Sequence, residues 1–305
     1  MKKFIDNLSC ENFFSFYSSF FRIFICFHLL KKIVLTWEYK ELIYTSDSFY
    51  VHDQSGLFDL FNINQMSLRD NFVLLYFVYF ILILFYFFGL GKYLTAVLLY
   101  VFFEFFQNLC PVLLNGGDNL LKFIMLYMIF IDSYGYFKMK PLVIKNKSID
   151  SFKNFLSNIF GYSICVHLCV VYFISAIHKI HADVWFNGIA TYYTLSLERF
   201  RGTSYNLELA KNGVFVTIST YGTIFIELLY PILIWFKKTK IVMILLALIL
   251  HISIYVLMMI YDFQLIFIFV QGFFINNCYW IKFYNNTKLK INELKRRFIK
   301  AYDIH

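Results

Sequence analysis

The residues of this chain best suited to chemistry lie at the end of one apolar segment. His178, Lys179, His181 and Asp183 follow a run of apolar residues long enough to cross a bilayer. An ammonium group loses hydration there, which is costly. Lys179 therefore either pairs with an anion, such as Asp183 one turn later, or gives up its proton and becomes a base. The structural alternative is a lysine that reaches the outer interface beside Trp185 as a helix-end anchor.

Other apolar segments contribute a few further polar side chains. His251 lies midway along its segment and needs a hydrogen-bond partner, for which Glu227 and Lys179 are candidates. Arg22, midway along the first segment, always keeps its proton. It needs a carbonyl or acidic partner (Glu104 or Glu227), or it binds an anionic substrate group. We interpret Lys179, Glu227 and His251 as candidate catalytic residues and Arg22 as a candidate substrate-binding residue.

The segment Asn115-Gly-Gly-Asp118-Asn119 predicts a tight turn before a helix. We expect Asp118 to cap that helix by accepting backbone N–H groups, with the glycines permitting the turn. The same glycines would let a ligand approach the backbone closely. Asp118 therefore joins the candidate substrate-binding residues. His178 and Trp185, on either side of Lys179 in its own segment, are candidates as well.

A metal site is the less favoured interpretation of the histidines. His167, His178 and His181 are 11 and 3 residues apart, within about 60° of one another on a helix. That spacing permits half of a metal site. No second His-x-x-His or Glu-x-x-His pattern occurs in another apolar segment, so we predict no metal. The six cysteines lie in or beside apolar segments without a Cys-x-x-Cys pattern, and we expect buried free thiols.

The composition predicts an all-α, polytopic integral membrane helical bundle. Hydrophobic residues make up 60% of the 305, the mean hydropathy is +0.63, and charged residues make up 15%. A soluble domain would carry roughly 25% charged residues. A span needs about 20 apolar residues. About eight transmembrane helices are therefore expected, at 13–36, 71–90, 94–114, 119–137, 155–180, 213–236, 241–260 and 262–281.

Lysine and arginine residues gather in alternate loops. With eight spans, the loops at 138–153 and 237–240, the N-terminal lysine pair and the tail all fall on one side. The positive-inside rule makes that side cytoplasmic. We therefore expect a transmembrane domain at 1–281 and a basic cytoplasmic tail at 282–305. The protein would be a multi-pass protein of the cell inner (plasma) membrane with both termini in the cytoplasm. The net charge of +9 is explained by these loops, so the expected partner is the lipid bilayer and not nucleic acid.

Four motifs resemble a known superfamily. The segment Tyr172-Phe-Ile-Ser-Ala-Ile-His-Lys179-Ile-His-Ala-Asp183-Val-Trp185-Phe-Asn-Gly188 resembles the part of vitamin K-dependent gamma-carboxylases that carries their catalytic lysine, with the pattern Tyr-Phe-small-small-x-x-Lys followed by Trp and Gly. The other three motifs resemble the bacterial HTTM (horizontally transferred transmembrane) branch and occur in order between 13 and 275: Phe20-Phe-Arg22-Ile with Tyr44-Thr-Ser-Asp47, Gly116-Gly-Asp118-Asn-Leu-Leu-Lys122, and Glu227-Leu-Leu-Tyr-Pro231 with His251 one span later.

The resemblance implies a chemistry for Lys179. In the carboxylases this lysine faces the lumenal side and deprotonates vitamin K hydroquinone, whose oxygenation yields a base strong enough to take a proton from glutamate. Lys179 would be the base here, and a reduced quinone such as vitamin K hydroquinone is the cofactor to consider. The carboxylases carry a large lumenal domain after their spans, whereas a basic tail follows here. We therefore do not expect protein gamma-carboxylation by this chain alone.

We accordingly expect an HTTM-type membrane protein with a polar pocket opening outward, lined by Arg22, Asp118, Lys179, Glu227 and His251. Its activity would be base-assisted chemistry on a quinone-like or peptide substrate, or maturation of a secreted peptide together with a second maturation factor. A sub-branch of HTTM proteins resembles a membrane component that helps to mature a secreted bacterial peptide toxin. Two alternatives stay open: a non-catalytic chaperone of a secreted peptide, and a small transporter, which the lack of internal repeats disfavours.

Overall fold

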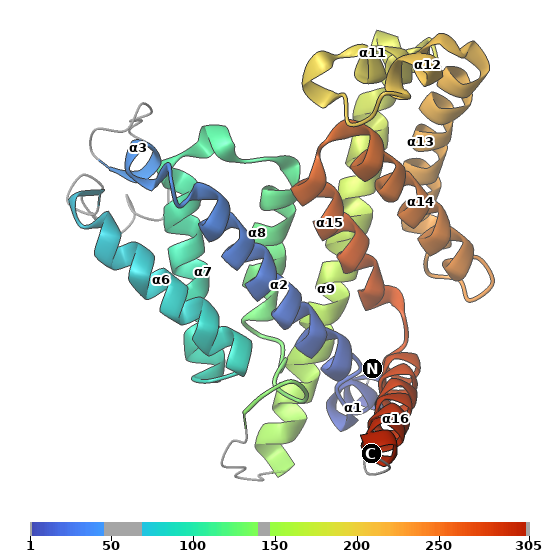
Figure 1. Cartoon of the computed structure of the whole chain (residues 1–305). Helices are drawn as coiled ribbons and strands as arrows, with labels where there is room; N and C mark the ends of the chain where they lie inside the picture. Colours follow the sequence, from blue (N-terminus) through green and yellow to red (C-terminus); the bar gives the residue numbers. More distant parts are fainter. Residues whose placement is uncertain (1, 46–68, 140–146, 303–305) are drawn as a thin grey trace.

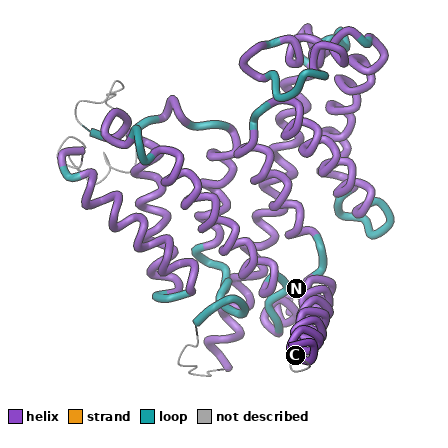
Figure 2. The backbone as a smooth tube through the Cα atoms, in the orientation of Figure 1, coloured by secondary structure: helices purple, strands orange, loops and turns teal. Residues whose placement is uncertain are grey.

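The computed structural model describes residues 2–45, 69–139 and 147–302, and these form helices without any strand (Figures 1 and 2). The prediction of an all-α fold is confirmed. The elements in chain order are α1 (Lys2–Cys10), α2 (Ser15–Thr36), α3 (Lys40–Tyr44), α6 (Phe72–Phe88), α7 (Lys92–Leu109), η1 (Pro111–Leu113), α8 (Gly116–Met128), α9 (Lys147–Ile180), α10 (Asp183–Phe186), α11 (Ala190–Ser196), η2 (Glu198–Phe200), α12 (Asn206–Lys211), α13 (Gly213–Leu233), α14 (Lys240–Met258), α15 (Tyr261–Val270), η3 (Gln271–Phe274) and α16 (Asn277–Tyr302).

Each of the eight predicted spans contains a helix, but the helices differ in their capacity to cross a membrane. Among the described residues, α9, α13 and α14 are long and apolar enough to do so alone. The bent pair formed by α15–η3 and α16 adds a fourth if it counts as one span. Helix α6 has 17 residues and α8 has 13, and α2 carries Arg22, Lys31 and Lys32. The structure therefore supports a membrane protein with three or four candidate spans, and eight spans remain a prediction.

The other helices pack around α9, a helix of 34 residues at the centre of the bundle. Helix α9 contacts α8 on one side and α13 on the other, and α1 packs against its first half. Helices α2, α6 and α7 form one lateral group, while α13, α14 and α15 form the other (Figure 1). Helix α15 joins the two groups, because it contacts α8, which packs against α7, and because its Asp262 pairs with Lys31 of α2. The candidate site lies in the second group.

The outward faces of α13 and α14 are apolar. Large side chains such as Val214, Ile218, Ile249 and Ile252 are exposed there. An exposed apolar surface of this extent is unfavourable in water and favourable in hydrocarbon. This observation supports contact with a lipid bilayer.

The two termini lie at the same end of the bundle, opposite the short helices α11 and α12 (Figure 1). This arrangement agrees with an even number of chain crossings. Helix α16 is bent by 105° from α15–η3, after Ile275 adopts an extended conformation. The expected boundary between 281 and 282 falls inside α16, so the first part of the predicted tail continues that helix.

Candidate functional site

A cavity of about 500 Å³ lies between α9, α13, α14 and α15, with α11 against it. We call it the Lys179 cavity. Its size is within the range of small-molecule sites. Most of the lining is apolar, and a few polar side chains converge on it, as in many ligand pockets. These polar lining residues are Tyr172, Ser175, Lys179, Thr191, Thr194, Ser219, Thr223, Glu227, His251, Ser253 and Gln264.

Lys179 is held in the cavity by three acceptors. Its Nζ donates to Glu227 Oε1 at 2.7 Å, to Glu227 Oε2 at 2.6 Å and to Ser175 Oγ at 2.6 Å. The Trp185 ring centroid lies 5.1 Å from the same Nζ, within the range of a cation–π contact. The Lys179 side chain is 18% exposed and that of Glu227 9%. The ammonium is therefore paired, largely buried and saturated in hydrogen bonds.

The partner of Lys179 differs from the one suggested by the i, i+4 spacing. Helix α9 ends at Ile180, and Ala182 is extended before α10 begins at Asp183. The break removes the helical geometry that would bring an i+4 side chain alongside the lysine. Asp183 is exposed, and Glu227 on α13 takes the lysine instead. Ser175, one turn before Lys179 on continuous helix, does make its contact.

His251 belongs to a buried chain of hydrogen bonds at the wall of the cavity. Its Nε2 lies 2.6 Å from the Tyr172 hydroxyl, and its Nδ1 is bonded to Gln264 Oε1. Gln271 Nε2 donates to the Tyr172 hydroxyl at 2.9 Å, and Tyr230 donates to Gln271 Oε1. Because an amide oxygen only accepts, Nδ1 carries the proton and Nε2 accepts from Tyr172. Both nitrogens of His251 are thus occupied, Nε2 by the Tyr172 hydroxyl and Nδ1 by Gln264.

Arg22 does not line the Lys179 cavity. It is fully buried, and its Nε donates to the Ser133 carbonyl at 3.1 Å. Its remaining N–H groups donate to backbone carbonyls at the end of α6 and in the segment after α8, those of Tyr86, Phe87, Tyr136 and Phe137. The prediction that Arg22 has a buried partner is confirmed. The expectation that it shares a pocket with Lys179 is wrong, because all five of its donors are used on backbone carbonyls elsewhere.

Asp118 is the third residue of its helix and not its cap. The N-cap is Asn115, whose Oδ1 accepts from the Asp118 N–H at 3.3 Å, while Asp118 Oδ2 accepts from the Asn115 N–H at 3.0 Å. This reciprocal pair is a capping box. Asp118 also pairs with Lys32 of α2. It is absent from the lining of the Lys179 cavity, which Gly116 does reach.

Among the other predicted binding residues, Trp185 lines the cavity, whereas His178 is exposed and outside it. The three histidines do not converge: His167 contacts the Tyr127 hydroxyl at 3.2 Å, and His181 contacts the Ile177 carbonyl. Within the described ranges, no group of three His, Cys, Asp or Glu side chains could hold a metal ion. The cysteines are free, with Cys10 and Cys278 exposed and the other four buried.

Sequence reasoning missed the glutamines and several ion pairs. Gln264 and Gln271 are seven residues apart, two helical turns, and this spacing could have indicated a shared polar face. Lys122 pairs with Glu104, which was considered only as a partner of Arg22. Lys31 pairs with Asp262, in addition to the Lys32–Asp118 pair. These pairs join α2, α7, α8 and α15.

Comparison of the chain with protein-family models, with curated proteins and with solved structures found no match. The assignment of a function therefore rests on the geometry of the Lys179 cavity and on the sequence motifs.

Proposed function

We propose that this chain is an HTTM-type integral membrane protein of the vitamin K-dependent gamma-carboxylase-like superfamily. In this proposal it has eight spans, both termini are cytoplasmic, and it performs base-assisted chemistry or maturation of a secreted peptide at the outer face of the inner membrane. The observation that carries the proposal is the buried pair of Lys179 and Glu227 in a cavity of about 500 Å³. The sequence motif around Lys179 supports it independently.

The pair supplies a way to form a base. In a site of low dielectric constant the charged form of the pair is only slightly more stable than the neutral form, because both charges are poorly solvated. A substrate that displaces the remaining water from the cavity would favour transfer of one proton from Lys179 Nζ to Glu227, because the neutral pair is penalised less by burial than the charged one. The neutral amine then accepts a proton from the substrate, and the ammonium is restored. Glu227 is the proton acceptor within the pair, Ser175 orients the amine, and Trp185 stabilises the ammonium.

The cavity is compatible with a flat aromatic cofactor. Trp185, Phe263 and Phe267 supply ring surfaces along its lining, and Thr191 and Thr194 supply hydroxyl groups. A reduced quinone bound there would supply an acidic hydroxyl group for the base. The residues of this chain would orient the ring, exclude water and hold the proton on Lys179 or Glu227.

A second candidate function is a non-catalytic partner that binds and chaperones a secreted peptide. One observation favours it: the Lys179 ammonium is saturated and both nitrogens of His251 are occupied, so no free base faces the cavity. In this interpretation the ion pair fixes α9 to α13 and the cavity binds part of the peptide.

Replacement of Lys179 by arginine separates the two candidates. A guanidinium keeps the charge and the pairing with Glu227 but cannot act as a base. We expect a deletion strain to lose or alter specific secreted peptides in a mass-spectrometric comparison, and the wild-type gene to restore them. Lys179→Arg should insert normally and fail to restore them, as should Lys179→Met. Full restoration by Lys179→Arg would exclude the base and favour the chaperone, and an unchanged set of peptides in the deletion strain would refute both.

A further inference from the structure

A second, smaller cavity of about 230 Å³ lies on the other side of α15, between α2, α6 and α7. We call it the Gln107 cavity. Its wall is mostly aromatic and aliphatic, with rings from Tyr44, Tyr76, Tyr79, Phe103 and Phe106. The first turn of α15 separates the two cavities, because Asp262 lines the smaller one and Phe263 and Gln264 line the larger one. The proposed chemistry at Lys179 makes no use of this second space.

The cavity is lined by a glutamine whose amide donor has no partner in the described part of the chain. Gln107 is 7% exposed, and its Nε2 has no hydrogen-bond partner among the residues that the structure describes. Buried polar groups are nearly always bonded, so an N–H₂ group left open toward a cavity indicates a missing acceptor. Lys32 lines the same cavity, and its ammonium uses one hydrogen on Asp118. Two elements, α2 and α7, therefore present donors to one small space.

The charges around the cavity favour a neutral acceptor. Lys32 is paired with Asp118 and Lys31 with Asp262, so the two lysines and two carboxylates cancel. A carboxylate or phosphate would meet two aspartates and would have to displace one of them from its lysine. A carbonyl oxygen needs no such displacement and accepts readily from an amide N–H. The charges therefore favour an uncharged carbonyl over an anion.

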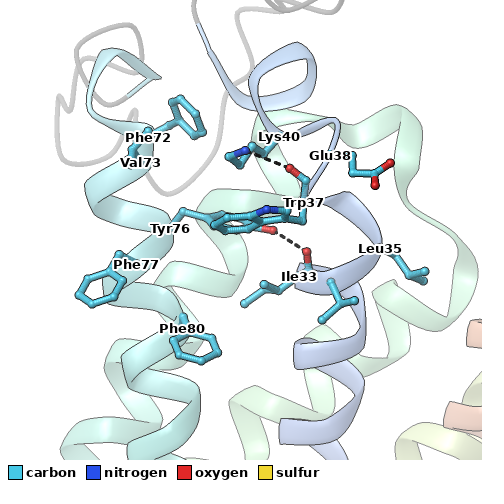
Figure 3. Close-up of a pocket in the computed structure, with 11 residues that line it drawn as sticks. Ile33, Leu35, Trp37, Glu38, Lys40, Phe72, Val73, Tyr76, Phe77 and Phe80 are labelled. Carbon is cyan, nitrogen blue, oxygen red and sulfur yellow. Dashed lines mark hydrogen bonds between the residues drawn. The ribbon is translucent and has the colours of Figure 1, made fainter.

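An apolar groove adjoins the cavity. The groove lies between α2 and α6, and Figure 3 shows lining residues from both helices, Phe77 and Phe80 of α6 and Ile33 of α2. Its volume is about 880 Å³. Ile33, Leu35 and Tyr76 line both spaces, so the groove begins where the cavity ends. Tyr76 spans them, with its hydroxyl donating to the Ile33 carbonyl at 3.0 Å.

We propose that these two spaces form one lipid site, in which the Gln107 cavity binds the ester carbonyl of a neutral glycerolipid and the groove holds its hydrocarbon chain. The open amide donor of Gln107, the lysine beside it and the zero net charge of the ion pairs indicate a neutral head group with a carbonyl acceptor. The volume and the apolar lining of the groove indicate a hydrocarbon chain. The site does not depend on the function proposed for Lys179.

The test uses the full chain in detergent and radiolabelled monoolein, which carries one ester and one chain. We expect saturable binding by the wild type and binding about tenfold weaker in Gln107→Leu, because the amide donor to the carbonyl is lost. Gln264→Leu is the matched control, since the same substitution in the other cavity should leave monoolein binding unchanged. Val73→Trp, at an exposed groove position, should also weaken binding without touching the core.

Two further probes identify the group that is recognised. The ether analogue of monoolein lacks the carbonyl and should bind as weakly to the wild type as monoolein binds to Gln107→Leu. Oleate carries the same chain on a carboxylate and should bind less tightly than monoolein. Four results would each overturn the proposal. Monoolein binding could be unsaturable, or it could be equally tight in the wild type, Gln107→Leu and Val73→Trp. The wild type could also bind the ether analogue as tightly as monoolein, or bind oleate more tightly than monoolein.

Discussion

Replacement of Glu227 by leucine isolates the energetic role of the ion pair in the Lys179 cavity. The substitution removes both carboxylate oxygens and leaves the ammonium with Ser175 and the Trp185 ring. Breaking a buried pair by removal of one partner typically costs about 3–5 kcal/mol. The loss has an upper limit, because a lysine can shed its proton at pH 7 for about 4–5 kcal/mol. We expect Glu227→Leu to lower the free energy of unfolding by about 3–4 kcal/mol at pH 7.

The double variant Lys179→Met/Glu227→Leu removes both charges. Apolar replacement of a whole buried pair is often neutral or stabilising, so the double variant should lie within about 1–2 kcal/mol of the wild type. The interaction energy between the two sites should then be at least about 1 kcal/mol, within the range seen for residues in direct contact. Asp262→Leu, which breaks the more exposed pair with Lys31, should cost at most about 1 kcal/mol.

The assay is equilibrium unfolding in mixed micelles of detergent and dodecyl sulfate, followed by circular dichroism at several pH values. The lysine stranded in Glu227→Leu is protonated in the unfolded state and penalised in the folded one. The unfolded state therefore binds more protons, and the stability of this variant should rise with pH by up to about 1.4 kcal/mol per unit between pH 7 and 10.

Two results would refute this reasoning. One is a loss below about 1 kcal/mol for Glu227→Leu with no pH dependence, which would mean that the ammonium reaches solvent and is only an anchor. The other is a double variant as unstable as Glu227→Leu alone, which would show that the carboxylate is required for packing and not for its charge.

Three further predictions concern the scaffold. Gly272→Ala should destabilise the protein by about 1–3 kcal/mol in thermal unfolding, because the added methyl group would overlap the Tyr17 ring. Gly222→Ala, inside α13 with open space around it, should instead raise the stability by up to about 1 kcal/mol. Equal effects of the two substitutions would contradict the packing of Gly272 against Tyr17. Arg22→Lys should cost about 2–4 kcal/mol, since an ammonium has three donors for five carbonyls, and retention of the wild-type melting temperature would show that the carbonyls have other donors. In a cysteine-free background, Lys238→Cys should react with an impermeant maleimide only after the cells are permeabilised. Labelling of intact cells from outside would show that the proposed orientation in the membrane is wrong.

The apolar windows located every helix of the predicted bundle, and they were wrong chiefly about where the helices end. The window 119–137 is apolar throughout most of its length, yet α8 stops at Met128. The chain beyond it leaves the helix because Arg22 of α2 supplies donors to the carbonyls of Ser133, Tyr136 and Phe137. An unwound backbone is stable in an apolar setting only with such donors. Hydropathy carries no information about a donor that arrives from another helix.

The candidate site shows the same division between local and tertiary information. Residue type and position were enough to single out Lys179, Glu227, His251 and Trp185, which the structure places on one cavity. The pairing partner was not predictable, because a local spacing rule favoured Asp183 while the break after Ile180 removed it. The choice of Glu227 depends on how α13 packs against α9, which the sequence does not display.

The shortness of two neighbouring helices has a consequence for the surrounding lipid. Helix α8 and the α15–η3 stretch have 13 and 14 residues, and they contact one another. Each is about 20 Å long, against a hydrocarbon thickness of about 30 Å. A bilayer adapts to such hydrophobic mismatch by thinning locally. In the proposed eight-span arrangement, in which α8 crosses the bilayer, lipids beside Phe123, exposed on α8, would be compressed, and the protein should be most stable in membranes with short acyl chains.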